Sequence, residues 1–220
     1  MIRTDVINAL ADRYKYKTYL EIGVADKDLN FNKIGCPFKL CVDPNESANA
    51  DYIMISDTFF KQNSKIFDII FIDALHLDEQ LQKDIDNAFR CLSFGGTIVC
   101  HDTLPETKDA QRHIDISKFK SVEEFREHTR EHPGPWNGTC WKTIAKLNAT
   151  RDDIIIYTIK TLDAGVTIIR EGYQEKKPLD VKINYYMSDD LTWEYYINNR
   201  NDILNCLTVE EFEIILKAGI

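Results

Sequence analysis

The stretch between residues 67 and 101 constrains the fold of this chain more than any other. Phe67–Asp73 (FDIIFID) is almost continuously apolar, as a strand covered on both faces is. Asp78–Leu92 then places its apolar residues at helical spacing, and Gly96–His101 (GTIVCH) is a second apolar run. A strand, a helix and a strand in this order form a βαβ unit, which predicts a parallel sheet with a right-handed crossover.

Other short apolar runs indicate further strands on either side of this unit. They are Tyr19–Val24, Phe38–Asp43, Tyr52–Ile55, Ile154–Ile159 and Gly165–Arg170. Leu162-Asp163-Ala164 joins the last two as a hairpin, so we expect an antiparallel edge there. The predicted fold class is therefore α/β: a Rossmann-like, doubly wound, mostly parallel seven-stranded sheet with an antiparallel hairpin at its C-terminal edge.

The length of 220 residues, 44% of them hydrophobic, suits one globular domain or one domain with an appended tail. We expect residues 1–175 to form this domain. Residues 104–141 are irregular, with a helix at 121–131, and are expected to lie over the cleft as an insertion. Residues 176–220 are expected to be a helical extension packed on the same domain, since 189–217 look helical. Exposed apolar residues in this extension could support a homodimer.

Charge and composition exclude several classes of protein. A formal net charge of −9 argues against a nucleic-acid binder, which needs a basic face. No run of 18 apolar residues is present, so we expect no membrane-spanning helix, and the polar N-terminus is not a secretory signal. The six cysteines are scattered without a C-x-x-C pair, which favours free thiols and a cytoplasmic location over a zinc ribbon.

Acids and histidines follow five successive predicted strands. In a doubly wound sheet, ligands bind at the carboxyl ends of the strands, so these side chains are expected to share one site. They include Glu21, Asp26, Asp28, Asp43, Asp57, Asp73, His76, His101 and Asp102.

The turn after the first strand indicates the kind of cofactor. A dinucleotide site needs G-x-G-x-x-G, but here only Gly23 is present, and Asp26 and Asp28 would face a pyrophosphate. These acids suit a cofactor with positive charge and no phosphate, such as S-adenosylmethionine. Asp43, twenty residues after Gly23, is placed to accept hydrogen bonds from ribose hydroxyls.

Six segments in the right order make the chain similar to a known family. They are YLEIGV, CVDPN, SDTFF, FDIIFIDALH, the helix after it, and FGGTIVCHDTLP. Over roughly residues 15–170 the chain resembles the class I S-adenosylmethionine-dependent methyltransferases, and within them the small glycan and sugar O-methyltransferases related to the macrolide-sugar enzymes. The resemblance implies S-adenosyl-L-methionine as cofactor and a sugar hydroxyl of a glycan or glycan precursor as acceptor.

The resemblance also assigns roles to individual residues. The residues that it places around the cofactor are Glu21, Gly23 and Ala25 at the methionine end, Asp43 at the ribose, Ser56 and Asp57 beside the adenine, and Asp73. It makes Asp73 and Asp102 ligands of a divalent cation and His76 the general base. His101 stands where the relatives place another metal-ligating carboxylate, which leaves the metal set as Asp73, His101 and Asp102.

The chemistry of methyl transfer to a hydroxyl needs such groups. A bound Mg²⁺ or Mn²⁺ lowers the pKa of the hydroxyl, and a histidine with a pKa near 6.5 can accept its proton. Trp136 and Asn137 lie in a loop-like W-N-G segment and are expected to contact the acceptor together with His76, because aromatic faces stack on sugar rings.

Alternatives remain open for the function and for single residues. The acceptor could be a phenolic or polyketide hydroxyl, and an NAD-dependent enzyme or a non-catalytic relative are further hypotheses. Asp73 and Asp102 could be turn residues, His76 a surface histidine, and His101 a packed histidine behind the site. Trp136 could instead belong to the core.

Overall fold

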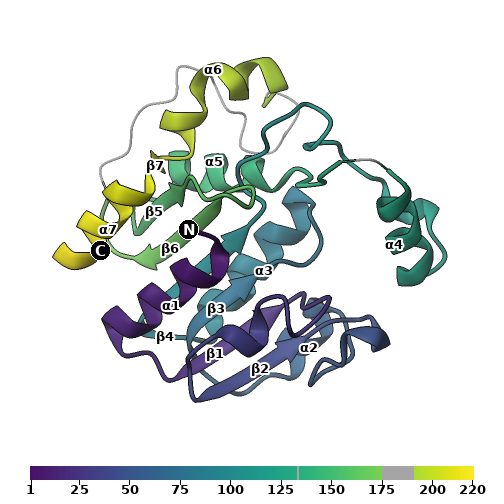
Figure 1. Ribbon diagram of the computed structural model, residues 1–220, viewed down its shortest axis with the longest axis horizontal. Helices are drawn as coiled ribbons and strands as arrows, with labels where there is room; N and C mark the ends of the chain where they lie inside the picture. Colours follow the sequence, from purple (N-terminus) through teal and green to yellow (C-terminus); the bar gives the residue numbers. More distant parts are fainter. Residues whose placement is uncertain (133, 175–190) are drawn as a thin grey trace.

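The computed structural model describes residues 1–132, 134–174 and 191–220. In this part of the chain, one seven-stranded sheet has the order β2-β1-β3-β4-β6-β5-β7 (Figure 1). The strands are β1 (Thr18–Ile22), β2 (Phe38–Val42), β3 (Phe67–Ile72), β4 (Leu92–His101), β5 (Ile154–Ile159), β6 (Val166–Glu171) and β7 (Cys206–Leu207).

Among the described strands, β6 runs antiparallel to its neighbours and the other paired strands are parallel. β1 pairs in parallel with β2 and β3, and β3 pairs in parallel with β4. β6 runs antiparallel to both β4 and β5, whereas β5 and β7 are parallel. The predicted Rossmann-like, mostly parallel sheet with an antiparallel hairpin is thus confirmed. The carboxyl ends of β1 to β4 consequently lie at one edge of the sheet.

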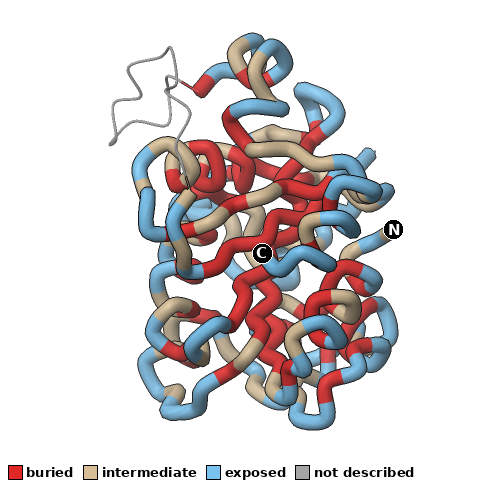
Figure 2. Tube along the Cα trace, turned by 90° about the vertical axis from the view of Figure 1, so that its left-hand side faces the viewer, coloured by how far each residue is buried: buried red, intermediate tan, exposed pale blue. Residues whose placement is uncertain are grey.

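Helices cover both faces of the sheet and produce two hydrophobic cores. The helices are α1 (Arg3–Tyr14), α2 (Ser56–Gln62), α3 (Asp78–Arg90), α4 (Val122–Glu131), α5 (Cys140–Thr150), α6 (Trp193–Ile203) and α7 (Val209–Ala218). One core joins the sheet to α2, α3, α5 and α6, and the other joins it to α1 and α7. Figure 2 shows buried residues running through the middle of the molecule. Because neighbouring strand residues point into opposite cores, the central strands are apolar without alternation.

The third predicted strand, Tyr52–Ile55, is wrong. Only Tyr52 pairs with the sheet, in an isolated bridge to Val42, and the chain then enters α2 at Ser56. The segment is too short to extend this pairing before the helix begins. The seventh strand is instead β7, whose two residues extend the sheet beyond β5.

The predicted helical stretch at 189–217 is two helices, α6 and α7, with β7 between them, and residues 189 and 190 lie outside the described residues. Thr208 ends the strand and begins α7 through a capping box with Glu211. In α7, the carbonyl oxygen of Leu216 accepts a 2.8 Å hydrogen bond from Arg13 Nε of α1. The last helix therefore packs beside the first helix of the chain.

In the described residues of the insertion at 104–141, the helical segments before α5 begins at Cys140 are a short 3₁₀ turn (Ile116–Lys118) and α4. Figure 1 shows α4 apart from the helices that cover the sheet. None of the residues of α4 is buried. Within the described residues, no helix is both long and apolar enough to cross a membrane.

Candidate active site

A cavity of about 700 Å³ opens at the carboxyl ends of β1, β2, β3 and β4. Residues from the insertion, between Ile116 and Trp136, form its other wall. The cavity is lined by all but one of the site residues predicted from the sequence: Glu21, Gly23, Ala25, Asp43, Ser56, Asp57, Asp73, His76, His101, Asp102 and Trp136. The exception is Asn137. The parallel strands thus bring residues from distant parts of the sequence to one surface.

Gly23 forms the turn that ends β1 against the end of β3. Its φ is +84°, and a Cβ atom added there would lie 2.2 Å from the Asp73 carbonyl oxygen. Its amide donates to the Val42 carbonyl oxygen at 2.8 Å. Only glycine combines this backbone conformation with such a close approach, so the turn fixes the floor of the cavity between two strand ends.

Asp43, at the end of β2, holds the same turn from the other side. Its Oδ2 atom accepts hydrogen bonds from the backbone N–H groups of Val24 at 2.9 Å and Ala25 at 3.0 Å. Its Oδ1 atom accepts one from the Asn45 N–H at 2.8 Å. The N–H groups that would bind a pyrophosphate in a dinucleotide site are therefore already bound to a carboxylate.

Glu21 is almost completely buried beneath the turn, with 1% of its surface exposed. Its Oε2 atom accepts hydrogen bonds from the Tyr19 hydroxyl and from Asn30 Nδ2, the latter at 3.0 Å. Burial raises the pKa of the Glu21 carboxyl to about 7, and these two hydrogen bonds limit the rise. The carboxyl can therefore change its charge near neutral pH.

Two histidines lie between two carboxylates at the centre of the cavity. His76 Nε2 is 3.1 Å from Asp102 Oδ2 and 3.4 Å from Asp73 Oδ1. His101 Nδ1 is 3.3 Å from each of the same two oxygens. Its other ring nitrogen, Nε2, is 3.4 Å from Asp163 Oδ2, away from these carboxylates.

The cluster shifts the pKa of its members in opposite directions. Burial alone would raise the pKa of Asp73, but His101 and His76 hold it well below its usual value. Burial would likewise lower the pKa of His76, but Asp102 and Asp73 raise it to about 9. The pKa of His101 is also well above its usual value, because Asp73 and Asp102 outweigh its burial. In the ligand-free protein, positive charge is thus held between the carboxylates.

His76 is oriented by the W-N-G-T segment that precedes α5. Its Nδ1 donates to the Trp136 carbonyl oxygen at 2.8 Å, and its ring lies 4.9 Å from the Trp136 ring between centroids. The Thr139 amide donates to the His76 carbonyl oxygen at 2.9 Å. Gly138, with φ +58°, packs so closely that a Cβ there would lie 1.7 Å from that oxygen. Nδ1 therefore carries a proton, and Nε2 faces the two carboxylates.

Asn137 does not line the cavity, so the expected contact with the acceptor is not what the structure shows. The residue is 3% exposed, and its Nδ2 donates to Asp102 Oδ1 at 2.5 Å. Asp102 has a φ of +56°, an uncommon conformation for a residue with a side chain. Asn137 thus positions the carboxylate rather than meeting a ligand. Trp141 belongs to the core, with no exposed surface.

Sequence reasoning missed several residues of the cavity because they come from elements far from the strand ends. Arg3 of α1 and Asp163 of the β5–β6 turn meet at 3.3 Å beside His101. Phe125 and Arg126 come from α4, where Arg126 Nη1 lies 3.8 Å from Asp43 Oδ1. No local motif marks these residues, and only the packing of α1 and of the insertion brings them to the site.

Comparison with known proteins gives this geometry a context. Residues 40–103, which run from β2 to the residue after Asp102, match a family model described as a methyltransferase domain. This part of the chain is therefore similar to a methyltransferase domain. The match supports the predicted methyltransferase over these residues, while the glycan and sugar branch remains a prediction.

The chain is also similar to several solved structures. Cofactor-bound Rv0187 from MTB has a TM-score of 0.50 at 15% identity, covering 78% of this chain and 80% of that one. An O-methyltransferase from Bacillus cereus in complex with SAH has a TM-score of 0.49 at 11% identity, with 78% and 82% covered. A putative caffeoyl-CoA O-methyltransferase from Staphylococcus aureus has 0.49 at 18%, with 77% and 82% covered. At these identities the likeness concerns the fold alone.

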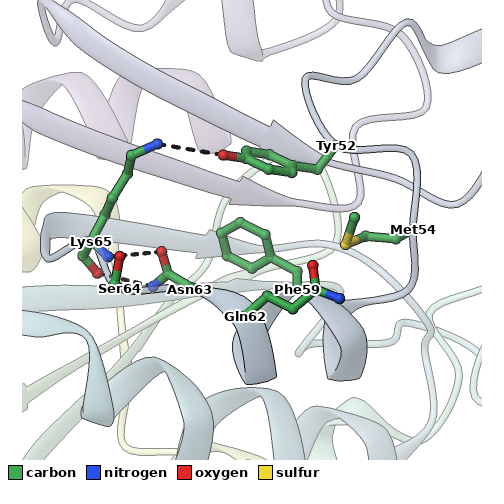
Figure 3. A pocket seen from close by; sticks show the side chains of 7 residues that line it. All are labelled: Tyr52, Met54, Phe59, Gln62, Asn63, Ser64 and Lys65. Atoms are coloured by element: carbon green, nitrogen blue, oxygen red, sulfur yellow. Dashed lines mark hydrogen bonds between the residues drawn. The ribbon is translucent and has the colours of Figure 1, made fainter.

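Residues of α2 and α3 also line the cavity. Gln80 Nε2 donates to Asp57 Oδ1 at 3.0 Å and to Ser56 Oγ at 3.3 Å, which ties the start of α2 to α3. Met54 lines this end and also a separate hollow of about 70 Å³ (Figure 3). Figure 3 shows Lys65 across the hollow from Met54, with its ammonium group bonded to the Tyr52 hydroxyl.

The donor set at the centre of the cavity suits a divalent cation. Among the described residues, the ligand atoms of Asp73, His76 and Asp102 all lie within 4.8 Å of one another. Neutral His76 would direct the lone pair of Nε2 at two carboxylates, which is unfavourable unless a proton or a cation lies between them. His101, the predicted third ligand, also lies 3.3 Å from both carboxylates through Nδ1, while its Nε2 is held by Asp163 and Arg3. Its role as a ligand stays a prediction.

Proposed function

We propose that this protein is an S-adenosylmethionine-dependent O-methyltransferase that acts on a sugar hydroxyl of a glycan or glycan precursor. One observation carries the proposal. His76 and the carboxylates of Asp73 and Asp102 face the same cavity as the Gly23 turn and the buried acid Glu21. A group that can remove a proton thus lies beside a pocket that suits a cationic nucleoside.

The cavity supports S-adenosylmethionine over a dinucleotide for two reasons. Its volume of about 700 Å³ lies within the usual range of ligand sites. The N–H groups of Val24 and Ala25 are bound to Asp43, so they cannot bind a pyrophosphate. The sulfonium and ammonium groups of S-adenosylmethionine are positive, and Glu21 and Asp73 give this end of the cavity its negative charge. A nicotinamide dinucleotide would bring negative charge to the same place.

We assign proton removal to the neutral form of His76, which is the form that can accept a proton. In the ligand-free site its pKa is about 9, so this form increases as the pH rises towards 9. Its Nδ1 donates to the Trp136 carbonyl oxygen, which fixes the ring and leaves Nε2 to exchange the proton. Asp102 and Asp73 stabilise the imidazolium that forms when the acceptor hydroxyl gives up its proton. A positioned base of this kind contributes roughly 10²- to 10⁴-fold to the rate.

Asp73 and Asp102 are the residues that would hold a divalent cation, which supplies a lower pKa for the acceptor hydroxyl when bound. Asn137 holds Asp102 in place through its amide, and His101 contacts both carboxylates from behind. Oxygen ligands favour Mg²⁺, and a histidine nitrogen beside them favours Mn²⁺ or a related ion.

The aromatic side chains of the insertion support a ring-shaped acceptor. Trp136 lies edge-on to Phe125, with their ring centroids 5.4 Å apart, and both line the cavity near His76. The face of a sugar ring can stack on such side chains while its polar edge points to the carboxylates. A flat phenolic ring could use the same aromatic wall, so the choice of acceptor needs an experiment.

Transfer of a labelled methyl group from S-adenosylmethionine tests the proposal. Monosaccharides, oligosaccharides, nucleotide sugars and catechols are offered in parallel, with Mg²⁺, with Mn²⁺ and with excess chelator. The expected result is an O-methylated sugar and a loss of activity in chelator. Methylation of catechols alone would refute the sugar acceptor, and full activity in chelator would refute the cation. Methylation of no hydroxyl acceptor would contradict the proposed function.

A further inference from the structure

Arg3 is the basic residue of the cavity wall that lies beside the buried acid Glu21. The other lysine and arginine residues of the wall are Lys120 and Arg126, which come from the insertion. Thr4, the neighbour of Arg3, donates to Asn30 Oδ1 at 2.7 Å, and Asn30 donates to Glu21 Oε2 at 3.0 Å. This chain of hydrogen bonds ties the start of α1 to the acid at the end of β1.

Within the described residues, the guanidinium group of Arg3 makes its hydrogen bonds through Nη1. Its Nη1 donates to Asp163 Oδ2 at 3.3 Å and lies 3.3 Å from His101 Nε2. The backbone amide of Arg3 donates to the same Asp163 oxygen at 3.0 Å. Nε is 3.9 Å from Asp73 Oδ2, and Nη2 makes no hydrogen bond within the described part of the chain. The free Nη2 thus belongs to a side chain that already lines the cavity.

The charges around Arg3 set a condition on any amino acid that binds here. A free amino acid moiety carries an ammonium group and a carboxylate on the same carbon, so both must be accommodated within a few ångströms. Glu21 and Asp73 suit the ammonium group and repel the carboxylate. A carboxylate at this end of the cavity therefore needs a cation, and guanidinium groups bind carboxylates through paired N–H donors.

We propose that Arg3 binds the α-carboxylate of the methionine moiety of the cofactor, while Glu21 binds its ammonium group. The inference rests on the proposed function, because it takes an S-adenosyl amino acid as the ligand. It adds a specificity-determining residue from α1, the first helix of the chain. Arg3 distinguishes cofactors with a free carboxylate from otherwise identical nucleosides that lack it.

Calorimetric titration with two ligands tests this assignment. One is S-adenosylhomocysteine, and the other is its decarboxylated analogue, which keeps the adenosine, the sulfur and the amine. The native protein is expected to bind S-adenosylhomocysteine about 10- to 100-fold more tightly, as a charge-assisted hydrogen bond implies. In Arg3→Met this ratio should fall to about 1, through weaker binding of S-adenosylhomocysteine alone. Arg3→Lys should keep part of the preference.

Arg13→Met is the matched control, because Arg13 lies on the same helix but donates to the Leu216 carbonyl oxygen at 2.8 Å. Its ratio should equal that of the native protein. If Arg3→Met weakens both ligands equally, Arg3 has only a structural role beside Asp163, and the inference is wrong. A collapse of the ratio in Lys120→Met instead would assign the carboxylate to the insertion. Failure of the native protein to bind either nucleoside would overturn the proposed function, and the inference with it.

Discussion

At the scale of single residues, the site depends on how His76 is held. The Trp136 carbonyl oxygen fixes one ring nitrogen, and two carboxylates face the other. The backbone of Gly138 packs closely against the His76 carbonyl oxygen, which limits the movement of His76. A histidine held in this way suits proton transfer better than a surface histidine would, because its orientation is set before the acceptor binds.

Replacing His76 by alanine should lower kcat by roughly 10²- to 10⁴-fold, as the loss of a positioned base does. The affinity for S-adenosylhomocysteine should change less than about threefold, since the acids proposed to bind the cofactor are Glu21 and Asp43. Binding of Mn²⁺ should persist, because Asp73 and Asp102 remain. His113→Ala, on the exposed surface, is the control. Unchanged turnover would remove His76 as the base, and loss of Mn²⁺ binding would make it a ligand instead.

The residues at the strand ends could be predicted from the sequence, because the end of an apolar run marks the end of a buried strand. Asp43, Asp73 and Asp102 each follow an apolar run, and parallel strands bring such ends together. Arg3 and Asp163 could not be predicted, because nothing in their local sequence indicates that α1 and the β5–β6 turn meet beside His101. Asn137 is predicted to contact the acceptor, but its amide instead donates to Asp102, a contact that no local pattern indicates.

At the scale of elements, the start of α5 is docked on the start of α3. Thr139 Oγ1 donates to Asp78 Oδ1 at 2.7 Å and accepts from the Asp78 amide at 2.9 Å. Thr143 Oγ1 donates to the Asp78 carbonyl oxygen at 2.7 Å. All three residues are buried. This contact holds the segment that carries Trp136 and Gly138 against the His76 loop.

Thr139→Val should therefore lower the free energy of unfolding by about 1–3 kcal/mol, because it removes the hydrogen-bond partner of the buried Asp78 amide and of Asp78 Oδ1. Urea denaturation measures the change. Thr150→Val, at the exposed end of the same helix, tests the same substitution without the hydrogen bonds and should change stability by less than about 0.5 kcal/mol. Equal effects of the two substitutions would show that the contact with Asp78 does not stabilise the protein.

Helices and strands with a clear local apolar pattern were predicted correctly. Those whose bounds depend on contacts with distant residues were not. Ile154–Ile159 was predicted with its observed bounds, and α3 with a difference of two residues at its end. The helical stretch expected at 189–217 is divided because Cys206 and Leu207 pair with β5, a contact that no local pattern reveals. Residues 176–190 of the predicted extension lie outside the described residues.

At the scale of the whole molecule, burial of Glu21 connects stability to pH. Its pKa is about 7 in the folded protein and is expected near the usual value of 4.5 after unfolding. Between these values the folded state binds more protons than the unfolded state. The contribution of Glu21 to the free energy of unfolding is therefore greatest below pH 4.5. It falls as the pH rises to 7, by roughly 3 kcal/mol in total.

Glu21→Gln keeps the shape of the side chain and removes its titration. Its free energy of unfolding, measured in urea between pH 5 and pH 7.5, should decline less steeply with pH than that of the native protein. Cofactor affinity should show the opposite trend in the native protein and rise with pH through 7, because the ammonium group needs the ionised carboxylate. Identical pH slopes of stability for the two proteins would contradict the raised pKa of Glu21.

The most direct test is whether the cavity binds a nucleoside, S-adenosylhomocysteine, or a dinucleotide, NAD. Calorimetric titration of the native protein with S-adenosylhomocysteine and, separately, with NAD measures which of the two ligands the cavity binds. Asp43→Ala removes the carboxylate that holds the turn, while Asp51→Ala removes one that instead accepts from Cys41 and Lys27. We predict micromolar binding of S-adenosylhomocysteine that weakens more than tenfold in Asp43→Ala alone, with no binding of NAD. Binding of NAD without S-adenosylhomocysteine would contradict the account.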